Sequence, residues 1–382
     1  MGIPIVLFVG SAVLYSLFIA FKYEKLRKEI FTYLILCLLI SVLFYLLTDS
    51  QTVSISSNYG IKRIVSKLQQ FLWMFFPLLL GFVFVKRSNK GQKIVMGILL
   101  IVIISVILFQ TLIAISANPD AARSFHTDEV VDEEMIPFIG NYYFVYLIPF
   151  LIIQLVDIFQ VNHKIAIRVL VVFLIIVLFD FLLKAQFTLS ILISFIGLLL
   201  VLGIHIRGSA AKLIYAFLML IIIFFVPSIL SYSINHIESV QIVDRLKEIH
   251  SFFITGVSDG YNLGGRLDLY KSSINAFFQS PIWGNRYLSF DGHATLLTIP
   301  ADLGLLGAVP FYYMLFHSRS LAVKFLSDKS IMNVIFIMLL LMGLTNPIHS
   351  SSQISFGVWF ITPYIVDLLN TLTQFSNNRY VS

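Results

Sequence analysis

Charged residues and cysteine are scarce in this sequence of 382 residues. Only 12% of the residues are charged and one is a cysteine, whereas 58% are hydrophobic. Because soluble domains carry about 25% charged residues, this composition excludes an ordinary soluble protein. A single cysteine, Cys37, excludes an internal disulfide. Because Cys37 stands within an apolar stretch, we expect a small buried side chain there. The chain is therefore expected to be an integral membrane protein.

Motifs for nucleotide, metal and nucleophilic chemistry are also missing. The sequence contains no Gly-x-x-x-x-Gly-Lys phosphate loop and no Gly-x-Ser-x-Gly nucleophile turn, and its histidines and carboxylates lack the spacing of metal ligands. We therefore expect no metal and no cofactor. The formal net charge of +6 is typical of basic residues at the cytoplasmic ends of membrane helices, so we expect no nucleic-acid partner.

Long apolar runs make up most of the chain. Runs of about 17 to 23 residues match helices that cross a hydrocarbon core roughly 30 Å thick, and the alternating pattern of a membrane β-barrel is missing. The sequence therefore predicts an all-α integral membrane protein with about eleven transmembrane helices. Their predicted ranges are 3–21, 30–47, 68–85, 94–116, 138–159, 165–183, 185–204, 212–231, 294–316, 331–345 and 353–370.

The distribution of lysine and arginine predicts the orientation of these helices. One set of alternate connections holds most of the basic residues, which places the N-terminus outside and the C-terminus in the cytoplasm. The first segment lacks the positive charges and the cleavage site of a signal peptide, so we expect it to remain as a helix. The predicted organisation is a single membrane domain, with helices in 1–231, an outer loop in 232–293 and further helices in 294–382.

Two of the predicted outer loops are unusual. The stretch 117–137 carries a cluster of Asp and Glu, which predicts a solvated loop, with a cation site as the alternative. The stretch 232–293 is longer than ordinary connections, and its composition is not that of a disordered segment. Apolar residues recur with helical spacing in 237–253 and 267–279, which predicts amphipathic helices lying on the membrane surface or against the bundle.

Short motifs follow one another in the stretch 264–307. In chain order they are a Gly-Arg pair, an aromatic residue, a Pro-x-x-Gly turn, a histidine that opens an apolar helix, and a Gly-x-x-Gly pair. They occupy Gly265 and Arg266, Tyr270, Pro281 and Gly284, His293, and Gly304 and Gly307. In this order and spacing the motifs resemble those of the O-antigen polymerase and O-antigen ligase superfamily of bacterial envelope glycosyltransferases.

The resemblance implies a GT-C-like fold and a metal-independent, inverting glycosyl transfer at the outer face of the bacterial inner membrane. The expected partners are membrane lipids, an oligosaccharide linked to undecaprenyl diphosphate, and a protein that regulates chain length. Polymerisation of repeat units for O-antigen or capsular polysaccharide is the favoured activity, and transfer of the glycan to the lipid A core is the alternative. A flippase for lipid-linked oligosaccharides is a further alternative, which the long outer loop and the missing internal repeats disfavour.

His293 is the expected catalytic residue. Free N–H groups and the positive dipole end at the start of a helix disfavour a protonated imidazole, and a neutral histidine can act as a general base. A structural histidine bonded to the loop is the alternative. Arg266 and Arg286 flank the second amphipathic run and are expected to bind the diphosphate, with surface arginines near lipid headgroups as the alternative. The resemblance adds Tyr270 to the substrate-binding residues.

Three further side chains are candidates for the same site. Lys184 lies between two predicted helices, where the superfamily carries a Ser-Arg pair that is missing here, and it is expected to add a positive charge near the diphosphate. An ion pair with Asp180, four residues earlier, is the alternative. His349, in the last outer loop, is expected to approach the same pocket, with an ordinary loop histidine as the alternative. Asp302 is expected either to orient a donor sugar or to bind a neighbouring helix.

Overall fold

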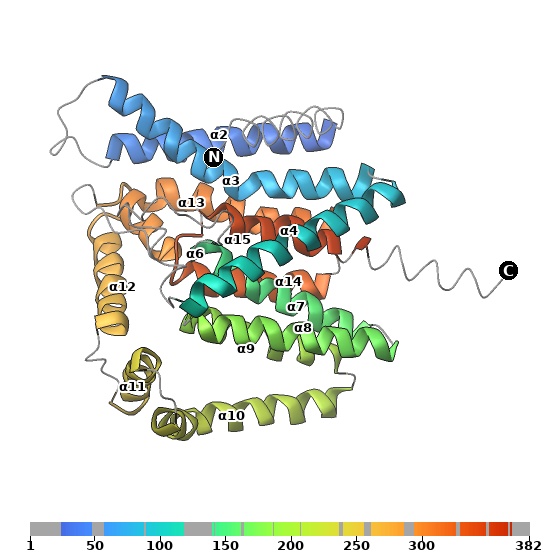
Figure 1. The fold of residues 1–382 in the computed structure, drawn as a ribbon. Helices are drawn as coiled ribbons and strands as arrows, with labels where there is room; N and C mark the ends of the chain where they lie inside the picture. The colour runs from blue at the N-terminus through green and yellow to red at the C-terminus, as the bar shows by residue number, and fades with distance from the viewer. Residues whose placement is uncertain are drawn as a thin grey trace. The chain divides into compact units, whose positions relative to one another are not determined.

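A computed structural model describes most of the chain as helices joined by short connections (Figure 1). Two compact units are formed, one from Met1–Ile107 with Ser273–Ser382 and the other from Leu108–Ser272. The predicted helix 3–21 and most of the acidic stretch 117–137 lie outside the described residues. The described residues are 24–47, 57–87, 89–117, 140, 142–161, 164–185, 187–206, 208–236, 240–255, 261–285, 294–325, 329–348, 351–365 and 367–368.

Several helices have the length and composition needed to cross a membrane. Among the described residues four ranges qualify by length and composition, namely Lys90–Ala117 (α4), Ile165–Lys184 (α8), Ser209–Tyr232 in α10, and Thr295–Lys324 in α13. Three shorter apolar helices, around Ile148–Gln160, Leu189–His205 and Lys329–Gly343, accompany them. Apolar side chains cover most of the circumference of α4 and α10, as in helices surrounded by lipid. The predicted all-α class is confirmed for the described residues, and the count of eleven spans stays a prediction.

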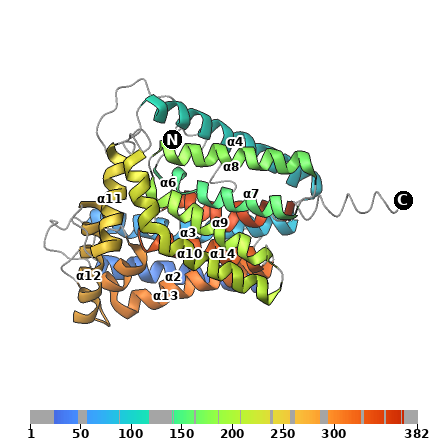
Figure 2. The same ribbon diagram turned by 90° about the horizontal axis from the view of Figure 1, so that it is seen from below.

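The Leu108–Ser272 unit is built around α7 (Ile148–Val161), which packs against α8 and α9 (Thr188–His205) (Figure 2). A turn separates α7 from the short α6 (Tyr142–Val145), so the predicted helix 138–159 is interrupted. Tyr146 packs edge-on against Phe187 before α9, and Oδ1 of Asp157 lies 3.2 Å from Nε2 of His205 at its end. Helices α7 and α9 therefore run in the same direction.

The last helices of this unit lie where apolar residues recur with helical spacing in the sequence. Helix α10 (Ser209–His236) packs against α11 (Val240–Thr255), which coincides with the first predicted amphipathic run. Helix α12 (Tyr261–Gln279) contains the second run and continues from this unit into the other one. The long predicted loop is thus largely helical in its described part.

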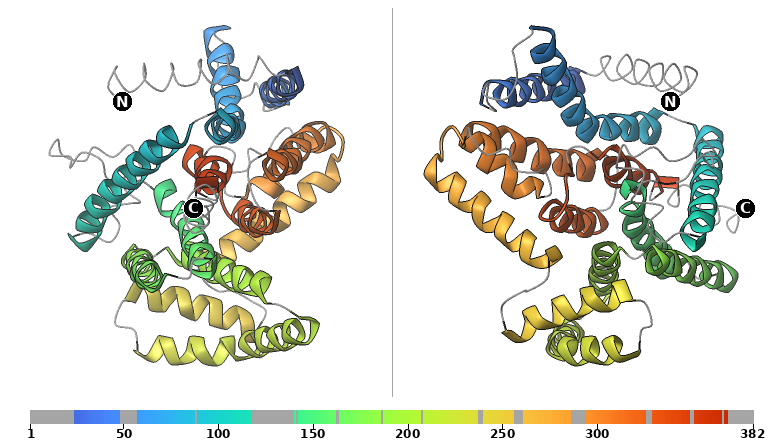
Figure 3. Two further views of the ribbon diagram at one scale, coloured as in Figure 1. Left: turned by 90° about the vertical axis from the view of Figure 1, so that its right-hand side faces the viewer. Right: turned by 60° about the vertical axis from the view of Figure 1, so that its left-hand side comes forward.

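The other unit is organised around contacts of α2 (Glu24–Leu47) with α3 (Ser57–Arg87) and α13, the first two being the blue helices of Figure 3. Tyr33 on α2 joins all three helices. Its ring stacks on Phe75 of α3 at 3.7 Å between centroids, and its hydroxyl lies 2.8 Å from Oγ of Ser318 and 3.0 Å from the Met314 carbonyl oxygen. This unit also contains most of α4, the end of α12 (Tyr261–Gln279), α14 (Lys329–Gly343), α15 (Ser352–Phe356) and the π-helical turn η1 (Gly357–Ile361).

The predicted helix 294–316 falls within α13 (Thr295–Phe325), which breaks at Gly304 (φ 59°, ψ −159°). The Tyr312 hydroxyl donates to the carbonyl of Leu296, sixteen residues earlier, although a straight helix would separate these residues by about 24 Å. The segment 295–303 therefore folds back toward 305–325. The Leu296 carbonyl is available because Pro300, four residues later, has no N–H to donate.

Replacing Tyr312 with phenylalanine is expected to lower the free energy of unfolding by about 1–3 kcal/mol, because the Leu296 carbonyl loses its partner between the two segments. Thermal unfolding in nanodiscs measures this change. Tyr313→Phe is the matched control, since Tyr313 is exposed on the same turn, and its effect is expected to stay within about 0.5 kcal/mol. Equal losses in the two variants would contradict the assigned role of the Tyr312 hydroxyl.

Candidate functional site

The Pro-x-x-Gly turn and the break in α13 cross one another at two glycines. Gly284 has φ 72° and Gly304 has φ 59°, which is the left-handed region that favours glycine. A Cβ atom on Gly284 would lie 2.2 Å from the carbonyl oxygen of Asp302, and one on Gly304 would lie 2.4 Å from the carbonyl oxygen of Ile282. The two backbones therefore touch with no room for a side chain. Two pieces of the motif that are separated in the sequence meet here.

Main-chain hydrogen bonds across this crossing complete both ends of the broken helix. The N–H groups of Leu305 and Leu306 donate to the carbonyls of Pro281 (2.8 Å) and Ile282 (3.3 Å). In the opposite direction, the N–H of Asn285 donates to the carbonyl of Ala301 (2.8 Å). N–H groups lose their intrahelical partners where a helix begins, and carbonyl groups lose theirs where a helix ends. One short turn therefore caps both segments of α13.

The beginning of α13 is held by the loop that follows α14. The N–H and the Oγ1 of Thr295 reach the carbonyl oxygen of Asn346, at 3.5 and 3.2 Å, and both residues are buried. Gly343 makes this approach possible, because a Cβ there would lie 3.0 Å from Leu296 and 2.9 Å from Ile348. The chain that follows His293 and the chain that leads to His349 are therefore side by side.

His293, His349 and Arg286 themselves lie outside the described residues, so their assigned roles stay predictions. Asp302 is described, and it lies directly in the crossing. Its side chain is only 6% exposed and its carbonyl faces Gly284. A buried carboxylate is costly unless it is bonded, and within membrane proteins such residues commonly serve a function. This position keeps Asp302 a candidate for orienting a sugar.

Arg266 and Tyr270 stand one turn apart on α12, in the Leu108–Ser272 unit. Burial raises the pKa of the Tyr270 phenol, and the nearby Arg266 lowers it by a smaller amount. The phenol therefore keeps its proton at neutral pH and can donate a hydrogen bond. A Cβ on the adjacent Gly265 would meet no atom within 4 Å, so the backbone beside Arg266 is open to a ligand.

Lys184 forms the ion pair that its spacing allows. Its Nζ lies 2.8 Å from Oδ2 of Asp180 in the last turn of α8, and both side chains are about half exposed. Pairs this exposed typically contribute about 0–1 kcal/mol, so the contact does not prevent the ammonium group from binding an anion. The structural alternative for Lys184 is thus observed, and its role at a diphosphate stays a prediction.

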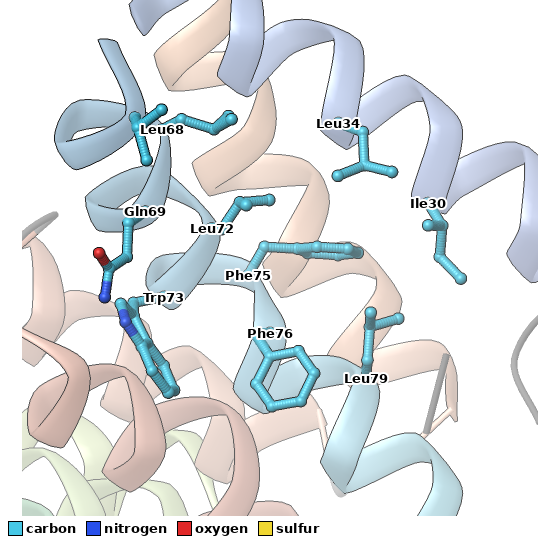
Figure 4. Close-up of a pocket in the computed structure, with 10 residues that line it drawn as sticks. Ile30, Leu34, Leu68, Gln69, Leu72, Trp73, Phe75, Phe76 and Leu79 are labelled. Carbon is cyan, nitrogen blue, oxygen red and sulfur yellow. The ribbon is translucent and has the colours of Figure 1, made fainter. Parts of the chain in front are cut away.

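An apolar groove of about 400 Å³ lies along α2 and α3 (Figure 4). Ile30 and Leu34 on α2 face the side of α3 that carries Leu72 and Phe75. The volume is within the range of ligand pockets, and none of the described residues that line the groove is charged, so it suits a hydrocarbon chain. The lining residues are Ile30, Leu34, Val65, Leu68, Gln69, Leu72, Trp73, Phe75, Phe76 and Leu79.

Sequence reasoning missed Thr295, Asn285 and Asn346. Thr295 begins a helix, Asn285 follows a motif glycine and Asn346 lies in the loop after α14, and a small polar residue at such a place is a weak signal. Asn285 and Asn346 act here through main-chain groups, and no side-chain pattern reports such a role.

Alanine at Gly284 or Gly304 is expected to lower the free energy of unfolding by about 2–5 kcal/mol, because the new Cβ atom adds backbone strain and overlaps the opposite main chain. Unfolding in detergent followed by near-UV circular dichroism measures the loss. Gly265→Ala is the matched control, since open space surrounds that position. Its stability is expected to be unchanged or slightly higher. A similar loss in all three variants would argue against the crossing.

Comparing Lys184→Ala with Asp180→Ala separates the two roles of the lysine. If Lys184 binds an anion, its replacement lowers turnover of a lipid diphosphate substrate, whereas Asp180→Ala leaves turnover near the wild-type value. Each variant alone is expected to change the free energy of unfolding by less than about 1 kcal/mol. Unchanged turnover in both variants would leave the ion pair as the whole role of Lys184.

No protein-family model matches this chain, and no curated protein matches its sequence. The resemblance to the glycosyltransferase superfamily rests on the order and spacing of the short motifs.

Proposed function

We propose that this protein polymerises oligosaccharide repeat units carried on undecaprenyl diphosphate, by inverting glycosyl transfer at the outer face of the bacterial inner membrane. The observation that carries the proposal is the crossing of Gly284 with Gly304. It joins the Pro-x-x-Gly and Gly-x-x-Gly pieces of the motif into one structure. The contact of Thr295 with Asn346 adds the start of α13, which follows His293 in the chain.

In the proposed reaction His293 takes the proton from a hydroxyl of the acceptor sugar. The hydroxyl oxygen attacks the anomeric carbon of the donor, and the bond from that carbon to the diphosphate oxygen breaks. The diphosphate leaves with the electron pair, and the configuration at the anomeric carbon inverts. Positive groups near the diphosphate stabilise the charge that develops on it. The residues proposed for this role are Arg266, Arg286 and Lys184, and Tyr270 and His349 are proposed to contact the substrate.

A general base must lie within hydrogen-bond distance of the hydroxyl that it deprotonates, so the chain around it has to be held firmly. Two features meet this need at the start of α13. The turn around Gly284 caps the far end of the segment 295–303, and Asn346 binds its first residue. Asp302 projects from the same short segment and is proposed to hold hydroxyl groups of the donor sugar.

The groove along α2 and α3 supports a substrate that is carried on a lipid. Its apolar walls suit an isoprenoid chain and offer little to a soluble sugar nucleotide, whose phosphates and base need polar partners. This observation fits the polymerase and the ligase equally, because both take the same class of donor.

The test uses protein in nanodiscs with a lipid-linked repeat unit, and product sizes are separated on a gel. Wild-type protein is expected to give a ladder of polymers, and His293→Ala is expected to lose at least about 100-fold in rate, as removal of a general base does. His250→Ala, a histidine on α11 outside the motif, is the matched control and is expected to keep the ladder.

An unchanged ladder in His293→Ala would remove the proposed base. Single transfer only after lipid A core is added would identify a ligase in place of a polymerase. Movement of the substrate across vesicles without any transfer would identify a transporter.

A further inference from the structure

The last two turns of α12 present three different faces. Ser273 and Ala276 are buried, at 1% and 2% exposure. About 150° around the helix, Ile274 and Phe278 are exposed, and Phe278 reaches 73%. On the remaining side the exposed residues are polar, namely Asn275 and Gln279. One short stretch of helix thus offers separate contacts for protein, for an apolar medium and for water.

The apolar face continues beyond the end of α12. Ile282 and Trp283 in the following turn are each about half exposed, and the Ile282 carbonyl accepts from the N–H of Leu306 at 3.3 Å. Leu306 begins a row of exposed apolar side chains on the second segment of α13, which includes Val309, Tyr313 and Phe316. This row lies on the segment 305–325 of α13, within the range Thr295–Lys324 whose composition is apolar enough for a membrane.

We propose that the end of α12 and the turn after it lie in the membrane interface, with Ile274, Phe278, Ile282 and Trp283 inserted among the lipids. The surface is continuous with the lipid-facing row of α13, and a boundary between hydrocarbon and water is the environment that matches adjacent apolar and polar faces. A tryptophan at the rim fits as well, because indole rings favour the level of the lipid headgroups. This assignment does not depend on which reaction the protein catalyses.

A bilayer is a better occupant than a second protein. The exposed polar residues Asn275 and Gln279 directly flank the apolar side chains, so a partner protein would have to satisfy them, whereas interfacial water does so without cost. The crossing of Gly284 with Gly304 then lies at the depth of lipid headgroups. A substrate with its reactive group at a lipid diphosphate would meet the crossing from the side, directly from the bilayer.

Spin labels test this assignment, because the chain has only one cysteine and that residue, Cys37, is buried. With Cys37→Ala as background, Phe278→Cys and Asn275→Cys are labelled with a nitroxide in liposomes of phosphatidylethanolamine and phosphatidylglycerol. Molecular oxygen concentrates in lipid, and a nickel chelate stays in water. The ratio of oxygen to nickel accessibility is expected to be several-fold higher at position 278 than at position 275.

High nickel accessibility at position 278 would overturn the proposal in favour of a face in water. Low accessibility to both reagents would overturn it in favour of a face covered by protein. Trp283 gives a second measurement that needs no label. With Trp73→Phe as background, because Trp73 lines the apolar groove, brominated lipids are expected to quench the fluorescence more when Trp283 is present than in Trp283→Phe, since Trp359 is fully buried. Equal quenching in the two proteins would contradict insertion of Trp283.

Discussion

The contact between the backbones of Gly284 and Gly304 constrains everything around it. Neither position has room for a Cβ atom, and hydrogen bonds run across the contact in both directions. The end of α12, the two segments of α13 and the turn between the helices therefore share one geometry. The bond from Thr295 to Asn346 fixes the other end of the short segment, so the chain that follows His293 is held at both ends.

Most of this chain is apolar, so where a helix is interrupted the freed main-chain N–H and C=O groups need hydrogen-bond partners within the protein. The structure provides them in two ways within α13. At Gly304 the main-chain groups of the broken helix form hydrogen bonds with the backbone of the turn around Gly284. At Pro300, which has no N–H, the carbonyl of Leu296 accepts a hydrogen bond from the Tyr312 hydroxyl instead. Both solutions use neutral hydrogen-bond partners.

Helices and amphipathic faces could be predicted from the sequence because they depend on the spacing of apolar residues, as at α8 and α11. The break at Gly304 could not, because the apolar run continues through it and hydropathy does not report a backbone dihedral. The spacing of Asp180 and Lys184 did indicate their ion pair. The meeting of Gly284 with Gly304 depends on tertiary structure, and the motif suggested only that these glycines mattered.

The crossing is made of main chain, and this has a consequence for how such a protein can diverge. Ile282, Leu305 and Leu306 supply only peptide groups to it, so their side chains can be exchanged without breaking a single hydrogen bond. Substitutions in the surrounding sequence then have little effect on the backbone structure of the crossing. The numbers of residues that separate the proline from the glycines must stay constant. Two proteins with this crossing can thus share the spacing of the proline and the glycines and have very little sequence identity.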